Sequence, residues 1–212
     1  MAATDTPSGR TFTWRTPVRW FGLLCLMGSA FFAGYVVWLL WGTGLETSRA
    51  QDELRAGLEQ AIDHPVAAPP SGTRPPLGSA YAAIVIPRID LDFIVVEGTD
   101  YESLKKGAGH YPDTADPWDA TGRVGIAGHR TTYLAPFFDL EDVIAGDRIS
   151  LLTEYGTFDY EVTRNYVIPS TGSGVVLRQT DQPTLVLTTC NPKYSSSERL
   201  IVEARQVGAA AA

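Results

Sequence analysis

The sequence is poor in the residues from which metal and nucleotide sites are built. It has only two cysteines and three histidines among 212 residues. It contains no Cys-x-x-Cys pair, His-Glu-x-x-His segment or phosphate-binding loop, no Gly-x-Gly-x-x-Gly turn in a suitable context, and no acidic stretch with calcium-ligand spacing. We therefore expect neither a metal nor any other cofactor.

Basic residues are also in the minority. The 17 lysines and arginines are outnumbered by 24 acidic residues, which gives a net charge of −7. A protein that binds the phosphate backbone of nucleic acid normally presents the opposite sign. We therefore expect no nucleic-acid partner. The hydrophobic fraction of 44% and the charged fraction of 19% are typical of a globular protein and exclude a disordered chain.

Charge is absent from one long segment, "WFGLLCLMGSAFFAGYVVWLLW" (residues 20–41). Its length suffices to cross the ~30 Å hydrocarbon core of a membrane as a helix. The first charge after it is Glu46, whereas three arginines precede it: Arg10, Arg15 and Arg19. The positive-inside rule then predicts a cytoplasmic tail (1–19), a transmembrane helix (20–41) and an extracellular remainder.

A cleaved signal peptide and a buried core helix are the alternatives for this segment. The apolar part of a signal peptide usually has only about 7–15 residues, and it is followed by a small-x-small cleavage site. The present segment is longer, and no clear site of that kind follows it directly. These features favour an uncleaved membrane anchor.

The remainder divides into a connecting region (42–80) and a strand-rich domain (81–207), followed by a short C-terminal tail (208–212). The connecting region begins with a helix-prone stretch (46–63) and continues as a proline-rich linker. The domain contains a short helix and eight β-branched runs: 81–87, 91–98, 122–129, 147–153, 156–163, 165–170, 184–190 and 199–207. Strands at such short spacing predict a mainly β fold, either a small closed barrel or a sandwich.

The two cysteines cannot form a disulfide in this topology. Cys25 lies inside the predicted span, and Cys190 lies in the extracellular domain. An unpaired cysteine in an oxidising compartment indicates a reactive thiol or an intermolecular partner.

Three polar residues stand where predicted strands begin or end. His129 ends "VGIAGH", Cys190 ends "LVLTTC" and Arg199 begins "RLIVEA". If the last two runs pair in antiparallel fashion, the loop 191–198 joins them and Cys190 lies near Arg199. A neighbouring cation favours the nucleophilic thiolate, a histidine can exchange protons with it, and arginine can stabilise an oxyanion. Each residue taken alone is also compatible with a structural role, so the residues themselves leave both interpretations open.

Four segments together resemble the sortase family: "AIVIPRIDLDFIVVEGT", "GAGHYP", "GIAGHRTT" and "LVLTTCNP" followed by "SERLIV". The resemblance spans residues 81–207, and it is strongest to the class E sortases of actinobacteria. It implies an eight-stranded sortase-type closed β-barrel with short helices, preceded by one transmembrane helix. It also implies a cysteine transpeptidase in which Cys190 is the nucleophile, His129 moves protons and Arg199 stabilises the substrate or the oxyanion.

The resemblance further implies the substrates. Sortases cleave a C-terminal sorting signal of the Leu-Ala-x-Thr-Gly or Leu-Pro-x-Thr-Gly type between Thr and Gly, through a thioacyl-enzyme. They transfer the surface protein to an amine of a cell-wall precursor. The implied substrate contacts are Thr188, Thr189, Tyr111 and Tyr133. A thiol hydrolase of the same fold and a non-catalytic, membrane-tethered binding domain are the alternatives.

Two residues do not match the motifs of the sortase family. The family pattern before the cysteine is Thr-Leu-x-Thr-Cys, and Val186 replaces its first threonine. We expect this change to alter packing beneath Cys190 without removing a catalytic group. His110 does not match the family's histidine segment, so we expect it to be a structural residue or part of a groove wall.

Overall fold

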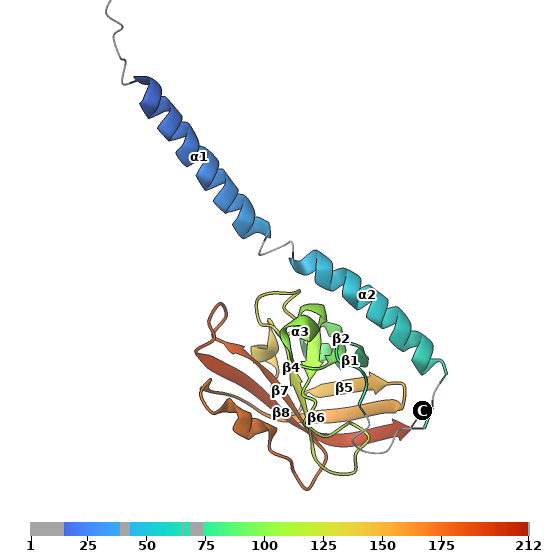
Figure 1. The fold of residues 1–212 in the computed structure, drawn as a ribbon. Coiled ribbons are helices and arrows are strands. Elements are labelled where there is room, and N and C mark those ends of the chain that lie inside the picture. Colours follow the sequence, from blue (N-terminus) through green and yellow to red (C-terminus); the bar gives the residue numbers. More distant parts are fainter. Residues whose placement is uncertain (1–14, 39–42, 65, 68–73, 212) are drawn as a thin grey trace, which may run out of the picture. The chain divides into compact units, whose positions relative to one another are not determined.

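The computed structural model describes residues 15–38, 43–64, 66–67 and 74–211 (Figure 1). The chain forms two compact units, which divide between Trp41 and Gly42. Most of the predicted cytoplasmic tail, with Arg10, lies outside the described residues. So do the last residues of the predicted span (39–41) and the middle of the predicted linker (68–73).

The described part of the first unit is one apolar helix, α1 (Arg15–Val37). Its stretch Pro17–Val37 is long and apolar enough to cross a membrane. A signal sequence near an N-terminus would have the same length and apolar character. Large apolar side chains such as Phe21, Phe31 and Phe32 are exposed along it. A helix that is apolar all round requires an apolar environment, so α1 is a candidate membrane anchor, as predicted.

The second unit is built on a closed β-barrel with the strand order β1-β2-β3-β4-β7-β8-β6-β5 (Figure 1). The strands are β1 (Ala80–Ile86), β2 (Leu91–Glu97), β3 (Ala108–His110), β4 (Arg123–Ala127), β5 (Arg148–Thr153), β6 (Gly156–Pro169), β7 (Thr184–Asn191) and β8 (Glu198–Ala211). Neighbouring strands are antiparallel except for two parallel pairs, β2 with β3 and β4 with β7. The predicted eight-stranded closed barrel is confirmed.

Side chains of β7 are buried on both faces of the barrel wall. Leu185 and Leu187 belong to the barrel core, whereas Val186 packs outside it with Ile201 of β8 and Val176 of the 3-10 helix η4 (Ser173–Leu177). Burial on both faces explains why this strand is apolar without alternation. Because side chains alternate along a strand, Cys190 lies on the same outer face as Val186.

The number of predicted strands is right, but two assignments differ. The runs 156–163 and 165–170 form one long strand, β6, whose register with β8 shifts between Val162 and Arg164. The polar residues at this irregularity resemble a turn in the sequence. The strand β3 was not predicted, because three residues that include a glycine carry no alternating pattern.

The predicted C-terminal tail (208–212) is largely strand. β8 continues to Ala211, which pairs with Gly156 at the start of β6. Small residues such as these alanines have no strand preference of their own. These residues extend the sheet because the beginning of β6 offers them an edge with which to pair.

The predicted helix of the connecting region is α2 (Thr43–Ile62), and it packs against the barrel. Its Leu58 is buried with Ala83 of β1 and Ile94 of β2. The Gln51 side chain accepts a hydrogen bond from the Ile94 N–H (2.7 Å) and donates to the carbonyls of Ile94 (3.0 Å) and Lys106 (2.8 Å). One amide group thus replaces a strand partner for Ile94.

The remaining helical segments are short. α3 (Tyr101–Lys106) begins at Asp100, whose carboxylate accepts hydrogen bonds from the backbone N–H groups of Glu102 and Ser103. It ends at Lys106, directly before Gly107. Two further 3-10 turns are η2 (Pro87–Ile89) and η3 (Leu140–Asp142).

The role of Gln51 can be tested by its replacement with alanine. This change leaves the buried Ile94 backbone groups without partners, so the free energy of unfolding of residues 43–212 should fall by about 1–3 kcal/mol. Urea denaturation measures this value. Gln60→Ala removes an exposed glutamine from the same helix and should change the value by less than about 0.5 kcal/mol. Equal effects of the two substitutions would contradict the account.

Candidate active site

The pairing of β7 with β8 places the predicted cysteine opposite the predicted arginine. The two strands are antiparallel, and Cys190 and Arg199 are direct partners in their register. Side chains of directly opposite residues leave the same face of a sheet, with Cβ atoms about 4.5–5.5 Å apart. Cys190 is half-buried and has a free thiol. The structure therefore brings these two residues together, as the antiparallel reading of the sequence requires.

The histidine reaches the same end of the sheet on the other side of β7. β4 runs parallel to β7 with Ala127 opposite Thr188. The next residue, Gly128, donates its N–H to the Thr188 carbonyl (3.1 Å), and its own carbonyl accepts a hydrogen bond from the Thr189 hydroxyl (2.7 Å). His129 follows at once. The three predicted catalytic residues thus stand at the ends of three adjacent strands: β4, β7 and β8.

Gly128 is required for this course of the chain. A Cβ atom at this position would collide with the ring of the buried Phe137. The close approach of ring and backbone lets the chain turn directly after β4, where His129 begins the connection to η3.

His129 is half-buried in an environment suited to proton transfer. Its ring packs against that of Tyr133, with 4.8 Å between centroids and an angle of 39° between the planes. Its Nε2 atom is buried and has no hydrogen-bond partner among the described residues. Burial lowers the pKa of His129 below its ordinary value, because the charged ring loses hydration. The ring is therefore mainly neutral near pH 7 and can accept a proton there.

Arg199 is held by the loop that joins β7 to β8. Its Nη1 atom donates to the carbonyls of Ser196 (3.0 Å) and Glu198 (2.9 Å). Within the described part of the chain, its other N–H groups have no partner. Arginine carries five N–H donors, so this side chain can still bind a carbonyl or an oxyanion.

A pocket of about 210 Å³ lies on the outer face of β7 and β8, beside the strand ends. Its lining comprises Tyr111, Ser173, Gly174, Val176, Leu177, Thr188, Arg199 and Ile201. The aliphatic members make it partly apolar. The Tyr111 hydroxyl forms a hydrogen bond with that of Thr188 (3.1 Å).

The four implied substrate contacts therefore lie in different places. Tyr111 and Thr188 line the pocket, and Tyr133 contacts the ring of His129. Thr189 is buried, and its hydroxyl binds the Gly128 carbonyl. Thr189 consequently joins the strand of His129 to that of Cys190, which is a positioning contact that its sequence position did not indicate.

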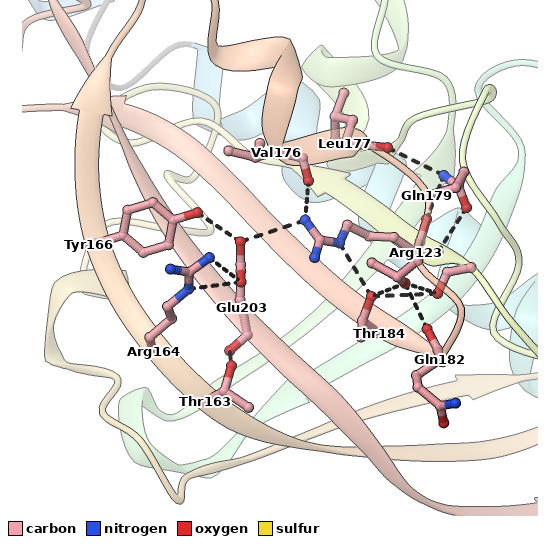
Figure 2. Close-up of polar contacts among 12 residues, drawn as sticks. Arg123, Thr163, Arg164, Tyr166, Val176, Leu177, Gln179, Gln182, Thr184 and Glu203 are labelled. Carbon is pink, nitrogen blue, oxygen red and sulfur yellow. Dashed lines mark hydrogen bonds and ion pairs between the residues drawn. The ribbon is translucent and has the colours of Figure 1, made fainter.

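A polar network that the sequence did not reveal holds one wall of the pocket (Figure 2). Arg123 of β4 donates to the carbonyl of Val176 in η4 (2.6 Å) and pairs with Glu203 of β8 (3.6 Å). Glu203 also accepts hydrogen bonds from Arg164 (2.9 Å) and the Tyr166 hydroxyl (2.7 Å). Figure 2 shows these side chains converging on the outer face of the sheet, so the network ties η4 to the barrel.

The charge of Glu203 is stabilised within this network. Burial by itself would raise the pKa of Glu203, but the hydrogen bonds from Arg164 and Tyr166 and the charge of Arg123 outweigh it and lower that pKa. The carboxylate therefore stays ionised at neutral pH and keeps its three partners.

The other two positions singled out in the sequence have structural surroundings. His110 is only 1% exposed, its Nδ1 lies 2.8 Å from the Glu97 carboxylate, and its ring stacks on Tyr81. It cannot reach a substrate from inside the barrel. Val186 is buried against Val176 and Ile201, where its methyl groups fill the space behind the pocket.

No described group of three His, Cys, Asp or Glu side chains is placed to hold a metal ion. The expected absence of a cofactor stays a prediction.

With this geometry in place, comparison with known proteins is informative. The model of the sortase domain family matches residues 84–207, which is more than half of the chain. The chain belongs to the sortase family. Sortases as a family are cysteine transpeptidases, and the predicted family is confirmed.

Three relatives illustrate the similarity. Sortase D of Bacillus subtilis is 36% identical over 119 residues, which are 56% of this chain and 58% of that protein. Sortase SrtE1 of Streptomyces coelicolor is 27% identical over 187 residues, which are 82% of this chain and 52% of that protein. The structure of sortase E from Streptomyces avermitilis has a TM-score of 0.56 at 35% identity and covers 64% of this chain and 92% of that one.

The chain spans little more than half the length of the two curated relatives. Sortases of both the D and the E type are among the matches, so the narrower resemblance to class E stays a prediction.

The lowered pKa of His129 can be measured directly. In protein with ¹³C-labelled histidine, the ring signal of His129 should titrate with a midpoint below the ordinary value of about 6.5. Because the folded state binds the proton less well than the unfolded state, this residue should also make the protein less stable as the pH falls below that value.

The assignment comes from substitution, since His129→Gln should remove the signal in question. A His129 midpoint at or above the ordinary value of about 6.5 would show that burial does not control this ring.

Proposed function

We propose that this chain is a membrane-anchored sortase. In this proposal it cleaves a C-terminal sorting signal between Thr and Gly and transfers the surface protein to an amine of a cell-wall precursor. The observation that carries the proposal is the placement of His129, Cys190 and Arg199 at the ends of three adjacent strands.

The chemistry follows from the three side chains. His129 takes the proton of the Cys190 thiol, and the resulting thiolate attacks the carbonyl carbon of the signal's threonine. Arg199 donates hydrogen bonds to the substrate backbone or to the oxyanion that develops. The bond to the glycine nitrogen breaks as His129 delivers a proton to the leaving amine. A thioester between the threonine and Cys190 remains.

The second half of the reaction restores the enzyme. The amine of the acceptor attacks the thioester carbonyl and gives up a proton to His129. The carbon–sulfur bond then breaks, and the thiolate of Cys190 leaves and recovers the proton from His129. Water in place of the amine would give hydrolysis through the same steps, so the acceptor alone distinguishes transfer from hydrolysis.

The lining of the pocket beside Cys190 supports the proposal that the signal carries an aliphatic residue there. Its wall includes Val176, Leu177 and Ile201, and its volume of about 210 Å³ accommodates a single side chain. Tyr111 and Thr188 supply polar contacts for the peptide backbone on the same surface. Leu-Ala-x-Thr-Gly and Leu-Pro-x-Thr-Gly signals both meet this requirement.

The membrane arrangement is part of the proposal. The candidate anchor is α1, and the arginines on its N-terminal side support a cytoplasmic N-terminus with the barrel on the outer surface of the cell. Surface proteins and cell-wall precursors, the proposed partners, are found on that side.

Incubation with peptides tests the proposal. We expect a Leu-Ala-x-Thr-Gly or a Leu-Pro-x-Thr-Gly peptide to leave an acyl adduct on Cys190, which mass spectrometry detects as an added mass. Substitution of His129 or Arg199 by alanine should reduce turnover by at least ~10²-fold, the scale of an acid–base or oxyanion group. Cys190→Ala should abolish the adduct.

The outcomes separate the competing functions. Product joined to an added amine indicates transfer, whereas free acid in the presence of amine indicates a thiol hydrolase. Absence of an adduct with both peptides would leave a non-catalytic binding domain. An adduct that survives in Cys190→Ala would overturn the assignment of the nucleophile.

A further inference from the structure

Arg130, the residue after His129, is a buried cation that the reaction scheme above does not use. Its side chain is only 1% exposed. Arginine is rarely buried to this extent unless it is paired, because its charge must be taken out of water. The surroundings of this guanidinium group should therefore explain its position.

The guanidinium group of Arg130 binds three acceptors, which belong to two segments of the chain. Its Nε donates to the carbonyl of Phe138 (2.9 Å), and its Nη2 pairs with the carboxylate of Glu141. Its Nη1 donates to the main-chain carbonyl of Cys190 (3.3 Å). One rigid, planar group thus connects the segment that starts at His129 with the residue that carries the thiol.

A second cation extends this connection to the loop after Cys190. Lys193 lies 2.8 Å from Glu141 and 3.3 Å from Asp139, and its ammonium group sits 3.8 Å from the centre of the Phe138 ring. Glu141 is therefore shared by Arg130 and Lys193. The hydrogen bond from Lys193 is the main cause that lowers the pKa of Glu141, and the charge of Arg130 adds to it.

The two cations differ in how strongly they can position the thiol. Lys193 and its acidic partners are partly exposed, and exposed ion pairs contribute little because solvent screens them. Arg130 is shielded from solvent and contacts Cys190 itself. Its hydrogen bonds should therefore dominate the connection.

We infer that Arg130 is a positioning residue, which holds the main chain of Cys190 against the segment of His129 so that thiol and imidazole stay aligned during acyl transfer. This inference rests on the proposed function. Misplacement of reacting groups by about 1 Å can cost ~10²-fold in rate. Loss of Arg130 should thus slow the chemical steps. It should leave the pocket unaffected, since Arg130 does not line it.

The test compares steady-state kinetics of variants of the full-length protein in detergent. Arg130→Met should lower kcat for the preferred peptide by about 30- to 100-fold and change KM by less than about threefold. Arg130→Lys keeps the charge but cannot bind three acceptors in one plane, so it should recover only part of kcat. Glu141→Gln preserves the hydrogen bond from Arg130 to the carbonyl of Cys190 and should reduce kcat by less than about fivefold.

The matched control is Arg205→Met. Arg205 is an exposed residue of β8 that pairs with Glu161 of β6, and it makes no hydrogen bond or ion pair with the described residues of the His129 segment or with Cys190. This variant should retain the kcat and KM of the wild type.

Each result supports or overturns the inference. An unchanged kcat in folded Arg130→Met, or an effect confined to KM, would overturn it. Thermal melting shows whether each variant is folded. If Arg130→Met is unfolded, Arg130→Lys serves as the test. A wild-type kcat in Arg130→Lys would then overturn the inference. If the wild type forms no acyl adduct at all, the proposed function itself fails, and this inference fails with it.

Discussion

The pairing of β7 with β4 on one side and β8 on the other is the constraint on which the site depends. Side chains of a strand alternate between faces, so a slip of one residue in either pairing would turn Cys190 into the barrel core. The apolar residues on both faces of β7 oppose such a slip, because Leu185 and Leu187 fit the core and Val186 fits beneath η4. Core packing thereby determines the position of the thiol.

Buried or partly buried arginines connect the loops to this framework. Arg123 ties the connection between β6 and β7 to the sheet and so forms a wall of the pocket. Arg130 ties the connection after β4 to the carbonyl of Cys190. Both guanidinium groups bind main-chain carbonyls, which fixes backbone rather than side chains. A rigid barrel with loops anchored in this way can keep reacting groups aligned while leaving the strand ends accessible to a peptide.

Much of this arrangement can be predicted from sequence. A contact between residues that are close in the sequence is easier to predict than a contact between distant segments. Cys190 and Arg199 flank a short loop between two apolar runs, so their proximity follows from a local antiparallel pairing. The parallel pairing of β4 with β7 joins distant segments, and the resemblance to sortases supplied the role of His129. The partners of Gln51, Thr189 and Arg130 arise only from tertiary packing. A polar residue that the fold buries resembles an exposed one in the sequence, so these roles emerge from the structure.

The central claim is that His129 and Arg199 converge on the thiol of Cys190. A crystal structure of the protein with a substrate peptide trapped on Cys190 as a thioester or a stable analogue measures this directly. The account predicts that the imidazole and the guanidinium group both lie within hydrogen-bond reach of the acyl group, at about 2.6–3.2 Å or through one water molecule. A structure in which either side chain points away from the bound peptide, with β4, β7 and β8 in the register described above, would contradict it.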